Sequence, residues 1–524
     1  MHIGDLRIGM VDGKEEFFLD GVDDPNFHSI FLIPENVRIK DFVDRAVYFI
    51  SGFRGTGKTS LLRYTLAEIQ PDSRFRAVSL FKSDIPEEKR IRLSKHAGAI
   101  IAEHDSIKMG IAQDFKSAWT WFLLDQIGQI VLKAPECSIS GKSKDDFLRI
   151  LGLNGEATFK KVLGFLPKLS GANVTIGADL DFFKGKVDLD FENERSTKAT
   201  ASFSEVVDAA IACLSQIEFK QKIAIGIDEL EVFFIAAEQY KRDLCMVRDL
   251  IFAVDRLNRI FRATNQNIYV IASIRREVVD AIGPLGQEVT RVVHDRGVSI
   301  SWHHAQRSLS HPLIDLIRKK IGAAIGPEYK GDAISDFFDS KIDGEDLDAF
   351  LLDRSFYRPR DLMWRLTFAQ KAFPSKTKFD THALKDTEND YSSQLWSEIE
   401  YELSASLSTE EVSAITSIFS GIKRLFFLDD LVAVGKQKAT YSKNVESFLN
   451  SHSLGDVCNM LYTHGALGND FRTGSTGNVS RNRWIFRGDN VLLVDQRMTL
   501  NPSIRKALSA IDQRKRGSAG GKKR

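Results

Sequence analysis

The sequence contains few cysteines, and they lie far apart. Cys137, Cys213, Cys245 and Cys458 form no CxxC pair and have no histidine pattern nearby. This spacing argues against a zinc site and against a disulfide framework, and it fits a reducing compartment.

Long apolar runs are also missing from the sequence. No stretch reaches the roughly 18 consecutive apolar residues that a membrane-spanning helix needs. The N-terminal segment MHIGDLRIGMVDGKEE has no apolar core of the kind found in signal peptides. We therefore expect a cytoplasmic protein that does not contact a membrane.

Neither sign of charge dominates. The 72 Lys and Arg residues nearly cancel the 71 Asp and Glu residues. Net charge therefore neither indicates nor excludes nucleic acid as a partner, and any basic surface has to be local. The length of 524 residues exceeds what one compact core holds, and it predicts about two to four domains.

A glycine-rich motif follows the first predicted strand. Residues 46–51 (AVYFIS) are a short apolar run that is typical of a buried strand. The next eight residues, GFRGTGKT, fit GxxxxGK[ST], and the segment after them has helical spacing. Glycines let backbone N–H groups surround phosphate oxygens, and the helix N-terminus adds its positive dipole end. The residues predicted to contact the nucleotide are Gly52, Arg54, Gly55, Thr56, Gly57, Lys58, Thr59 and Ser60.

Two residues of this motif have specific predicted roles. Lys58 is expected to reach the β- and γ-phosphates of ATP, and the hydroxyl of Thr59 to bind Mg²⁺. The alternative is a glycine-rich turn with a chance lysine, which the flanking strand and helix disfavour.

A second predicted strand ends in two carboxylates. Residues 223–229 read IAIGIDE, and continuous apolarity is typical of a central parallel strand buried on both faces. We predict that Asp228 holds Mg²⁺ and that Glu229 orients and polarises the attacking water. Such a string often merely ends a strand, but its combination with the glycine-rich loop favours an ATP hydrolase.

Further strands alternate with helices in the same region. The apolar stretch at 268–277 is predicted to be a strand that brings Ser273 near the γ-phosphate or the water. Arg275 follows it, where it can respond to phosphate charge. Two more strands are expected at 75–81 and 297–302. This alternation predicts a parallel α/β sheet.

These motifs together resemble the AAA+ and STAND ATPases over roughly residues 30–370. The chain is most similar to origin-initiator and archaeal STAND-type ATPases, which carry a winged helix after a helical lid. It also resembles uncharacterised bacterial P-loop ATPases that share a W…HPL…RPRDL pattern. That pattern reads here Trp302, then His311-Pro312-Leu313, then Tyr357-Arg358-Pro359-Arg360-Asp361-Leu362.

The resemblance implies a sensor arginine in the lid that faces the γ-phosphate. Arg358 and Arg360 lie at the corresponding place, and the sequence does not choose between them. The alternative is that both arginines cap the lid helix or form salt bridges with it. Arg291 and Arg296 lie where AAA+ proteins carry an arginine that acts on a neighbouring subunit.

One departure from the family is the separation of the two nucleotide motifs. Lys58 and Asp228 are about 170 positions apart, so residues about 105–205 are expected to hold an insertion. It is predicted to contain helices and a β-hairpin over 173–191. The hairpin either contacts DNA, a partner or a neighbouring subunit, or decorates the edge of the core.

The C-terminal third has the element order of a winged helix. After a polar connection at 377–394, Ser408 and Glu411 form a capping box, and short helices precede a predicted hairpin at 483–500. The helix near 454–463 has no Lys or Arg, and winged helices also bind proteins, so duplex DNA and a protein partner both stay open. If the unit binds DNA, the expected contacts come from Arg472, Arg481, Arg483 and Arg487.

The predicted fold class is α/β: a parallel-sheet P-loop core with a helical lid, followed by an α+β winged-helix domain. The expected domains are the core at 1–310, the lid and linker at 311–394, the winged helix at 395–510 and a disordered basic tail at 511–524.

The leading hypothesis is an ATP-binding and ATP-hydrolysing switch that controls DNA engagement or self-assembly. Family analogy extends this to bacterial regulation and defence against phage. One alternative is an ATP-dependent scaffold that recruits a separately encoded effector. Another is a winged-helix DNA-binding regulator with a degenerate nucleotide site, which the intact Lys58, Thr59, Asp228 and Glu229 disfavour.

Overall fold

The computed structural model describes residues 1–9, 25–81, 115–153, 203–230, 237–303, 308–404, 406–473, 479–489 and 491–511. The hairpin predicted at 173–191 and residues 512–524 of the predicted tail lie outside this part of the chain. Within it, no helix has both the length and the apolarity that crossing a bilayer requires.

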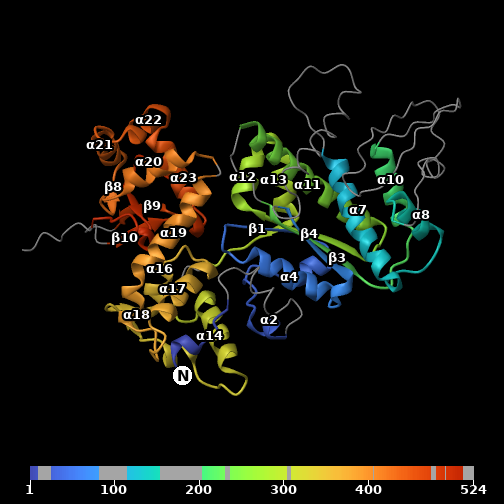
Figure 1. Ribbon diagram of the computed structural model, residues 1–524, viewed down its shortest axis with the longest axis horizontal. Coiled ribbons are helices and arrows are strands. Elements are labelled where there is room, and N and C mark those ends of the chain that lie inside the picture. The colour runs from blue at the N-terminus through green and yellow to red at the C-terminus, as the bar shows by residue number, and fades with distance from the viewer. Residues whose placement is uncertain are drawn as a thin grey trace, which may run out of the picture.

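A five-stranded, all-parallel sheet lies at the centre of the N-terminal part (Figure 1). The five predicted strands are confirmed, and the strand order is β2-β3-β4-β1-β5. The strands are β1 (Phe49–Gly52), β2 (Arg76–Leu80), β3 (Ile223–Leu230), β4 (Ile268–Arg275) and β5 (Gly297–Ser299).

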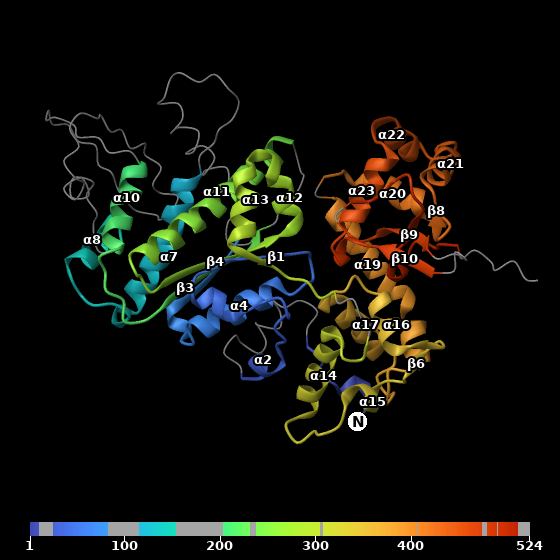
Figure 2. The same cartoon turned by 180° about the vertical axis from the view of Figure 1, so that it is seen from behind.

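The central strands are apolar because both faces of the sheet are covered. Every residue of β4 is buried, and Glu229 is the one residue of β3 that is partly exposed. The helix α4 (Lys58–Ile69) packs on one face, while α7 (Lys116–Lys133) and α11 (Ala237–Ala263) cover the other (Figures 1 and 2). This two-sided cover explains why the strands show no alternation of apolar and polar residues.

Two shorter helices extend α11's side of the sheet toward its carboxyl edge. They are α12 (Arg276–Ile282), which directly continues β4, and α13 (Gln287–Asp295), which leads into β5. Both contact α11 and each other.

A layer of helices follows the sheet along the chain. Its main members are α14 (Pro312–Ile325), α16 (Leu347–Asp353), α17 (Pro359–Ala372), α18 (Thr381–Asp386) and α19 (Glu388–Leu403). The polar connection predicted at 377–394 is wrong, because α18 and the start of α19 occupy it. One of its polar residues caps a helix, since Asp380 accepts a hydrogen bond from the backbone N–H of Ala383, 2.8 Å away. Tyr391, on α19, is buried.

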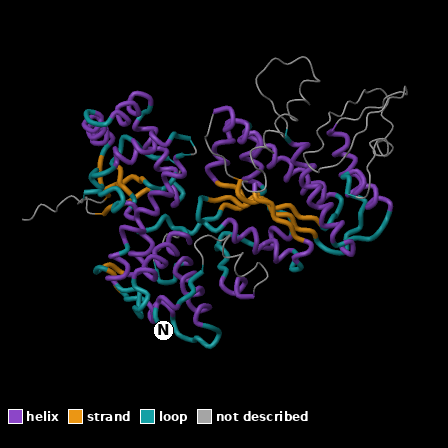
Figure 3. The backbone as a smooth tube through the Cα atoms, viewed as in Figure 1, coloured by secondary structure: helices purple, strands orange, loops and turns teal. Residues whose placement is uncertain are grey.

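The C-terminal unit combines four helices with a small antiparallel sheet. The helices are α20 (Thr409–Phe419), α21 (Leu428–Ala439), α22 (Lys443–Ser451) and α23 (Leu454–Thr463). The sheet has the order β10-β9-β11-β8 and appears as a separate strand group in Figure 3. Its strands are β8 (Leu425–Phe426), β9 (Leu467–Thr473), β10 (Val479–Arg483) and β11 (Met498–Leu500).

The C-terminal unit confirms one local prediction and corrects another. The capping box is present, since Ser408 and Glu411 each accept a hydrogen bond from the other's backbone N–H. The hairpin predicted at 483–500 is wrong: β9 and β10 form the hairpin, earlier in the chain. After β10 the chain forms a single helical turn at Ile485–Arg487 and then turns at Gly488, whose left-handed φ of 88° favours glycine.

Two apolar cores meet beside the glycine-rich loop. The larger core contains the sheet and the helices around it, and the smaller one contains α19, α20, α22, α23 and the C-terminal sheet. Phe53, in the loop after β1, packs against the smaller core. The loop therefore contacts an apolar cluster that α19 shares with the C-terminal unit.

Gly226 in β3 permits the close approach of α4. A Cβ atom built there would lie 2.6 Å from a methyl group of Leu66 and 3.3 Å from one of Val78. We expect Gly226→Ala to lower the free energy of unfolding by about 1–3 kcal/mol, because a well-packed core resists added volume. Urea denaturation measures the change. The matched control is Gly141→Ala, whose added Cβ meets nothing within 4 Å, and an equal loss in both variants would contradict the packing argument.

Candidate functional site

The glycine-rich loop connects the end of β1 to the start of α4. Gly55 and Gly57 have φ values of 79° and 93°, a backbone region that favours glycine. Lys58, Thr59 and Ser60 form the first turn of α4. The Lys58 Nζ atom donates a hydrogen bond to the Phe53 carbonyl oxygen, 2.9 Å away, and the Thr56 hydroxyl donates to the same oxygen at 2.8 Å. The Lys58 side chain therefore bends back toward the start of the loop that precedes it.

Asp228 and Ser273 meet at the carboxyl edge of the sheet. They lie on the neighbouring strands β3 and β4, and the Ser273 hydroxyl donates a hydrogen bond to Asp228 Oδ1. Their exposed fractions are 2% and 1%. The second carboxylate oxygen, Asp228 Oδ2, is buried and has no hydrogen-bond partner among the described residues. A buried, unsatisfied carboxylate oxygen is costly unless a donor or a cation completes it, so the residues fit a magnesium ion or its water.

The backbone at Glu229 is strained. Its φ is 58°, in the left-handed region that costs a residue with a Cβ about 1–2 kcal/mol. The pairing between β3 and β4 shifts register between Ile227 and Leu230. This irregularity turns Glu229 out of the ladder directly after the buried Asp228. Strain held by the surrounding structure is typical of functional positions.

Arg63 is a further candidate that the motif analysis missed. Burial lowers the pKa of Arg63, while the charges of Asp228 and Glu229 act in the opposite direction. The guanidinium therefore lies within the field of both carboxylates. The sequence could have indicated Arg63 by its spacing, because it follows Thr59 by four residues and so lies on the same face of the helix.

Arg54 and Arg275 share one carboxylate from the helical layer. Arg54 Nη1 lies 3.1 Å from Glu402 Oε1, and Arg275 Nη1 lies 2.8 Å from both oxygens of Glu402. Gly52 pairs with Arg275 across β1 and β4, so the two arginines emerge beside the same loop. Glu402 is the second residue that sequence reasoning missed.

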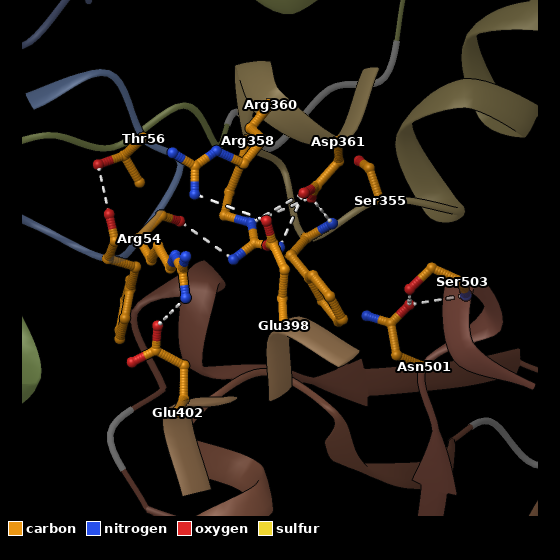
Figure 4. Close-up of polar contacts among 12 residues, drawn as sticks. Arg54, Thr56, Ser355, Arg358, Arg360, Asp361, Glu398, Glu402, Asn501 and Ser503 are labelled. Atoms are coloured by element: carbon orange, nitrogen blue, oxygen red, sulfur yellow. Dashed lines mark hydrogen bonds and ion pairs between the residues drawn. The ribbon is translucent and has the colours of Figure 1, made fainter. Parts of the chain in front are cut away.

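Arg358 and Arg360 open α17 directly against the loop (Figure 4). Arg358 donates to both carboxylate oxygens of Asp361 and, at 3.0 Å, to the carbonyl oxygen of Arg54. The backbone N–H of Arg360 donates to the Gly55 carbonyl oxygen at 3.4 Å. In this conformation Arg358 fastens the start of α17 to the loop, while the Arg360 side chain lies against Gly55.

The three parts of the W…HPL…RPRDL pattern converge at this point. The Trp302 indole N–H donates to the Thr56 carbonyl oxygen at 2.9 Å. The ring of His311 lies 5.7 Å from the ring of Tyr357, which precedes Arg358. The pattern is therefore a packing motif that fastens the loop to the helical layer.

A cavity of about 240 Å³ lies between the loop, the helical layer and the C-terminal unit. Glu277 lines it, and Glu277 Oε2 is buried with no hydrogen-bond partner among the described residues. Burial raises the pKa of Glu277, and the negative charge of Glu402 raises it further. Other lining residues are Phe53, Arg54, Thr56, Trp302, His303, Tyr357, Arg358, Glu398, Glu402, His464 and Phe486.

The four arginines predicted to contact DNA lie in two places. Arg472 and Arg481 lie on the paired strands β9 and β10. Arg483 forms an ion pair with Asp489 at 3.2 Å. The Arg487 guanidinium lies 5.9 Å from the Tyr357 ring, on the side of the cavity. Arg487 is therefore partly exposed and lies beside Tyr357, which precedes Arg358.

The strain at Glu229 generates a stability prediction. We expect the free energy of unfolding of Glu229→Gly to exceed that of Glu229→Ala by about 1 kcal/mol, because glycine accepts a positive φ. Both variants lack the carboxylate, so the comparison isolates the backbone. Equal stability of the two in urea denaturation would show that the left-handed backbone is not costly here.

Glu277 generates a pH prediction. Its raised pKa means that the folded state holds this proton more tightly than the unfolded chain does, so its ionisation destabilises the fold as the pH rises. We expect Glu277→Gln to raise Tm at neutral pH, with a gain that shrinks as the pH falls toward about 5. Thermal unfolding across that range tests it. A gain that stays constant with pH would instead reflect packing of the new side chain.

Comparison with known proteins identifies one segment of the chain. Residues 311–400 match the family described as a FunZ-associated C-terminal helical domain. No curated protein matches the chain. The matched segment contains α14, α17, α18 and most of α19, and it therefore carries Arg358, Arg360 and Glu398.

Proposed function

We propose that the protein binds ATP with Mg²⁺ and hydrolyses it, and that the nucleotide state controls what the C-terminal unit engages. The carrying observation is the buried pair of Asp228 and Ser273 beside the glycine-rich loop, with one carboxylate oxygen of Asp228 unsatisfied. Ligands of open parallel sheets bind at this carboxyl edge.

The residues divide the work by their chemistry. Backbone N–H groups of the loop and of the first turn of α4 bind phosphate oxygens, and Lys58 exchanges the Phe53 carbonyl for the β- and γ-phosphates. Thr59 and Asp228 would hold Mg²⁺, which would supply positive charge beside the phosphates. Glu229 orients the attacking water, and Ser273 fixes the orientation of Asp228.

The arginines around the loop supply positive charge for the transferring phosphoryl group. Arg275 and Arg360 approach the loop from β4 and α17, and either can stabilise charge that develops in the transition state. Arg358 has the different role of a positioning residue, because Asp361 and the loop carbonyl already engage it. These roles are compatible with an AAA+ or STAND-type ATPase.

The C-terminal unit has the order of elements expected of a winged helix, with α23 before the β9–β10 hairpin. Duplex DNA is the first candidate partner. A scaffold that recruits a protein effector is the second, and two observations favour it: α23 carries no Lys or Arg, and Arg487 lies beside Tyr357. Regulation or phage defence in bacteria remains an extension by family analogy.

Steady-state ATP hydrolysis by the full chain tests the proposal. We expect Lys58→Ala to lose ATP binding, and Glu229→Gln to bind ATP while its turnover falls by about 10²-fold or more. Glu288→Gln is the matched control, since this glutamate is exposed and pairs only at the surface with Arg291. Turnover that is the same in all variants would contradict the assigned roles.

The same assay separates the two partner classes. Turnover that rises with duplex DNA, and less so at high salt, would support DNA coupling. Turnover indifferent to DNA would favour the protein scaffold.

A further inference from the structure

We propose that α19 is an acidic latch, in which Glu398 and Glu402 hold the arginines of the nucleotide site until ATP phosphates replace these carboxylates. The proposal rests on the proposed ATP site and specifies its regulation. Release of the arginines would loosen α19, and with it the C-terminal unit, whenever ATP is bound.

The two glutamates lie one helical turn apart and face the same side of α19. Glu402 binds Arg54 and Arg275 at 3.1 and 2.8 Å. Glu398 lies 3.6 Å from Arg358 and 3.5 Å from Arg360. Figure 4 shows the side chains of Glu398 and Glu402 rising from below toward the arginines.

The four arginines come from three separate elements that border the nucleotide site. Arg54 belongs to the loop itself, Arg275 ends β4, and the other two open α17. The Arg54 guanidinium also lies 4.4 Å from the ring of Tyr401, the neighbour of Glu402 on α19. One helix therefore contacts all four of these arginines.

The latch carries charge. Burial alone would raise the pKa of Glu402, but the positive charge of Arg275, followed by those of His464 and Arg54, outweighs burial and lowers it. An ionised carboxylate in a poorly solvated position needs its arginines. Triphosphate offers the same guanidinium groups more negative charge, so the two anions compete for them. Nucleotide can shift α19 only through this difference in affinity.

Displacement of Glu402 would reach the C-terminal unit through packing. Leu395, Trp396 and Ile399, on the same helix, are buried in the smaller core, and Phe53 of the loop packs against that core. A movement of the loop and a release of α19 would thus act on the same apolar cluster.

Glu400 provides a matched control on the same helix. It points into the C-terminal unit, where its Oε1 atom accepts hydrogen bonds from the Trp396 indole at 2.9 Å and the Thr416 hydroxyl at 2.6 Å. Among the described residues it forms no ion pair with the four arginines. Glu400→Gln therefore tests what a glutamate-to-glutamine change on α19 does without opening the latch.

Titration of the full chain with a fluorescent ATP analogue in the presence of Mg²⁺ tests the proposal. We expect Glu402→Gln to bind about tenfold more tightly than the unchanged protein, because the arginines no longer have to leave a carboxylate. Glu398→Gln should tighten binding less, since its ion pairs are longer. Glu400→Gln should leave Kd unchanged.

Hydrogen exchange provides a second readout that needs no substitution. ATP should speed exchange in the amides of 388–403 in the unchanged protein, and Glu402→Gln should show faster exchange there without ATP. Binding of ATP with slower or unaltered exchange in α19, or with an unchanged or weaker affinity in Glu402→Gln, would overturn the latch alone. Absence of ATP binding from every variant would overturn the proposed function as well.

Discussion

The arrangement of the site depends on the burial of β3 and β4 on both faces. Strands covered by helices on each side have no solvent-facing positions, so their polar residues are confined to the carboxyl ends. Asp228 and Ser273 occupy those ends on neighbouring strands and therefore meet. The loop after β1 emerges one strand away, because β4 lies between β1 and β3. The glycine-rich loop, Asp228 and Ser273 are thus brought to one edge of the sheet by the strand order.

Charge balance is the second constraint. Four arginines crowd the loop, and two glutamates of α19 offset them. An arginine cluster of this density, partly removed from water, would repel itself without nearby anions. The fold can obtain the missing negative charge from its own helix or from a bound polyphosphate. Competition between these two sources of negative charge is the physical basis of the latch.

Several parts of the fold and of the candidate site could be predicted from the sequence, because each depends on residues close together in the chain. The GFRGTGKT loop, the IAIGIDE strand and the Ser408 capping box each contain their structural information within a few residues. The site's other components depend on contacts across hundreds of positions: Glu402 binds Arg54 from 348 residues away. The hairpin was misplaced for a related reason, since a glycine-rich stretch reads as a loop whether or not its flanks pair. The left-handed backbone of Glu229 could not be predicted from the residues around it, because it accompanies a register shift between two strands.

The packing of Phe53 into the smaller core affects how the chain can be divided. A fragment that ends before α19 would retain every residue of the glycine-rich loop and of β3. It would nevertheless leave an aromatic side chain uncovered and remove the carboxylates that face Arg54 and Arg275. Such a fragment would expose an apolar side chain beside arginines that have lost two of their carboxylate partners. The stretch of chain that completes the candidate site is therefore longer than the stretch that contains its motifs.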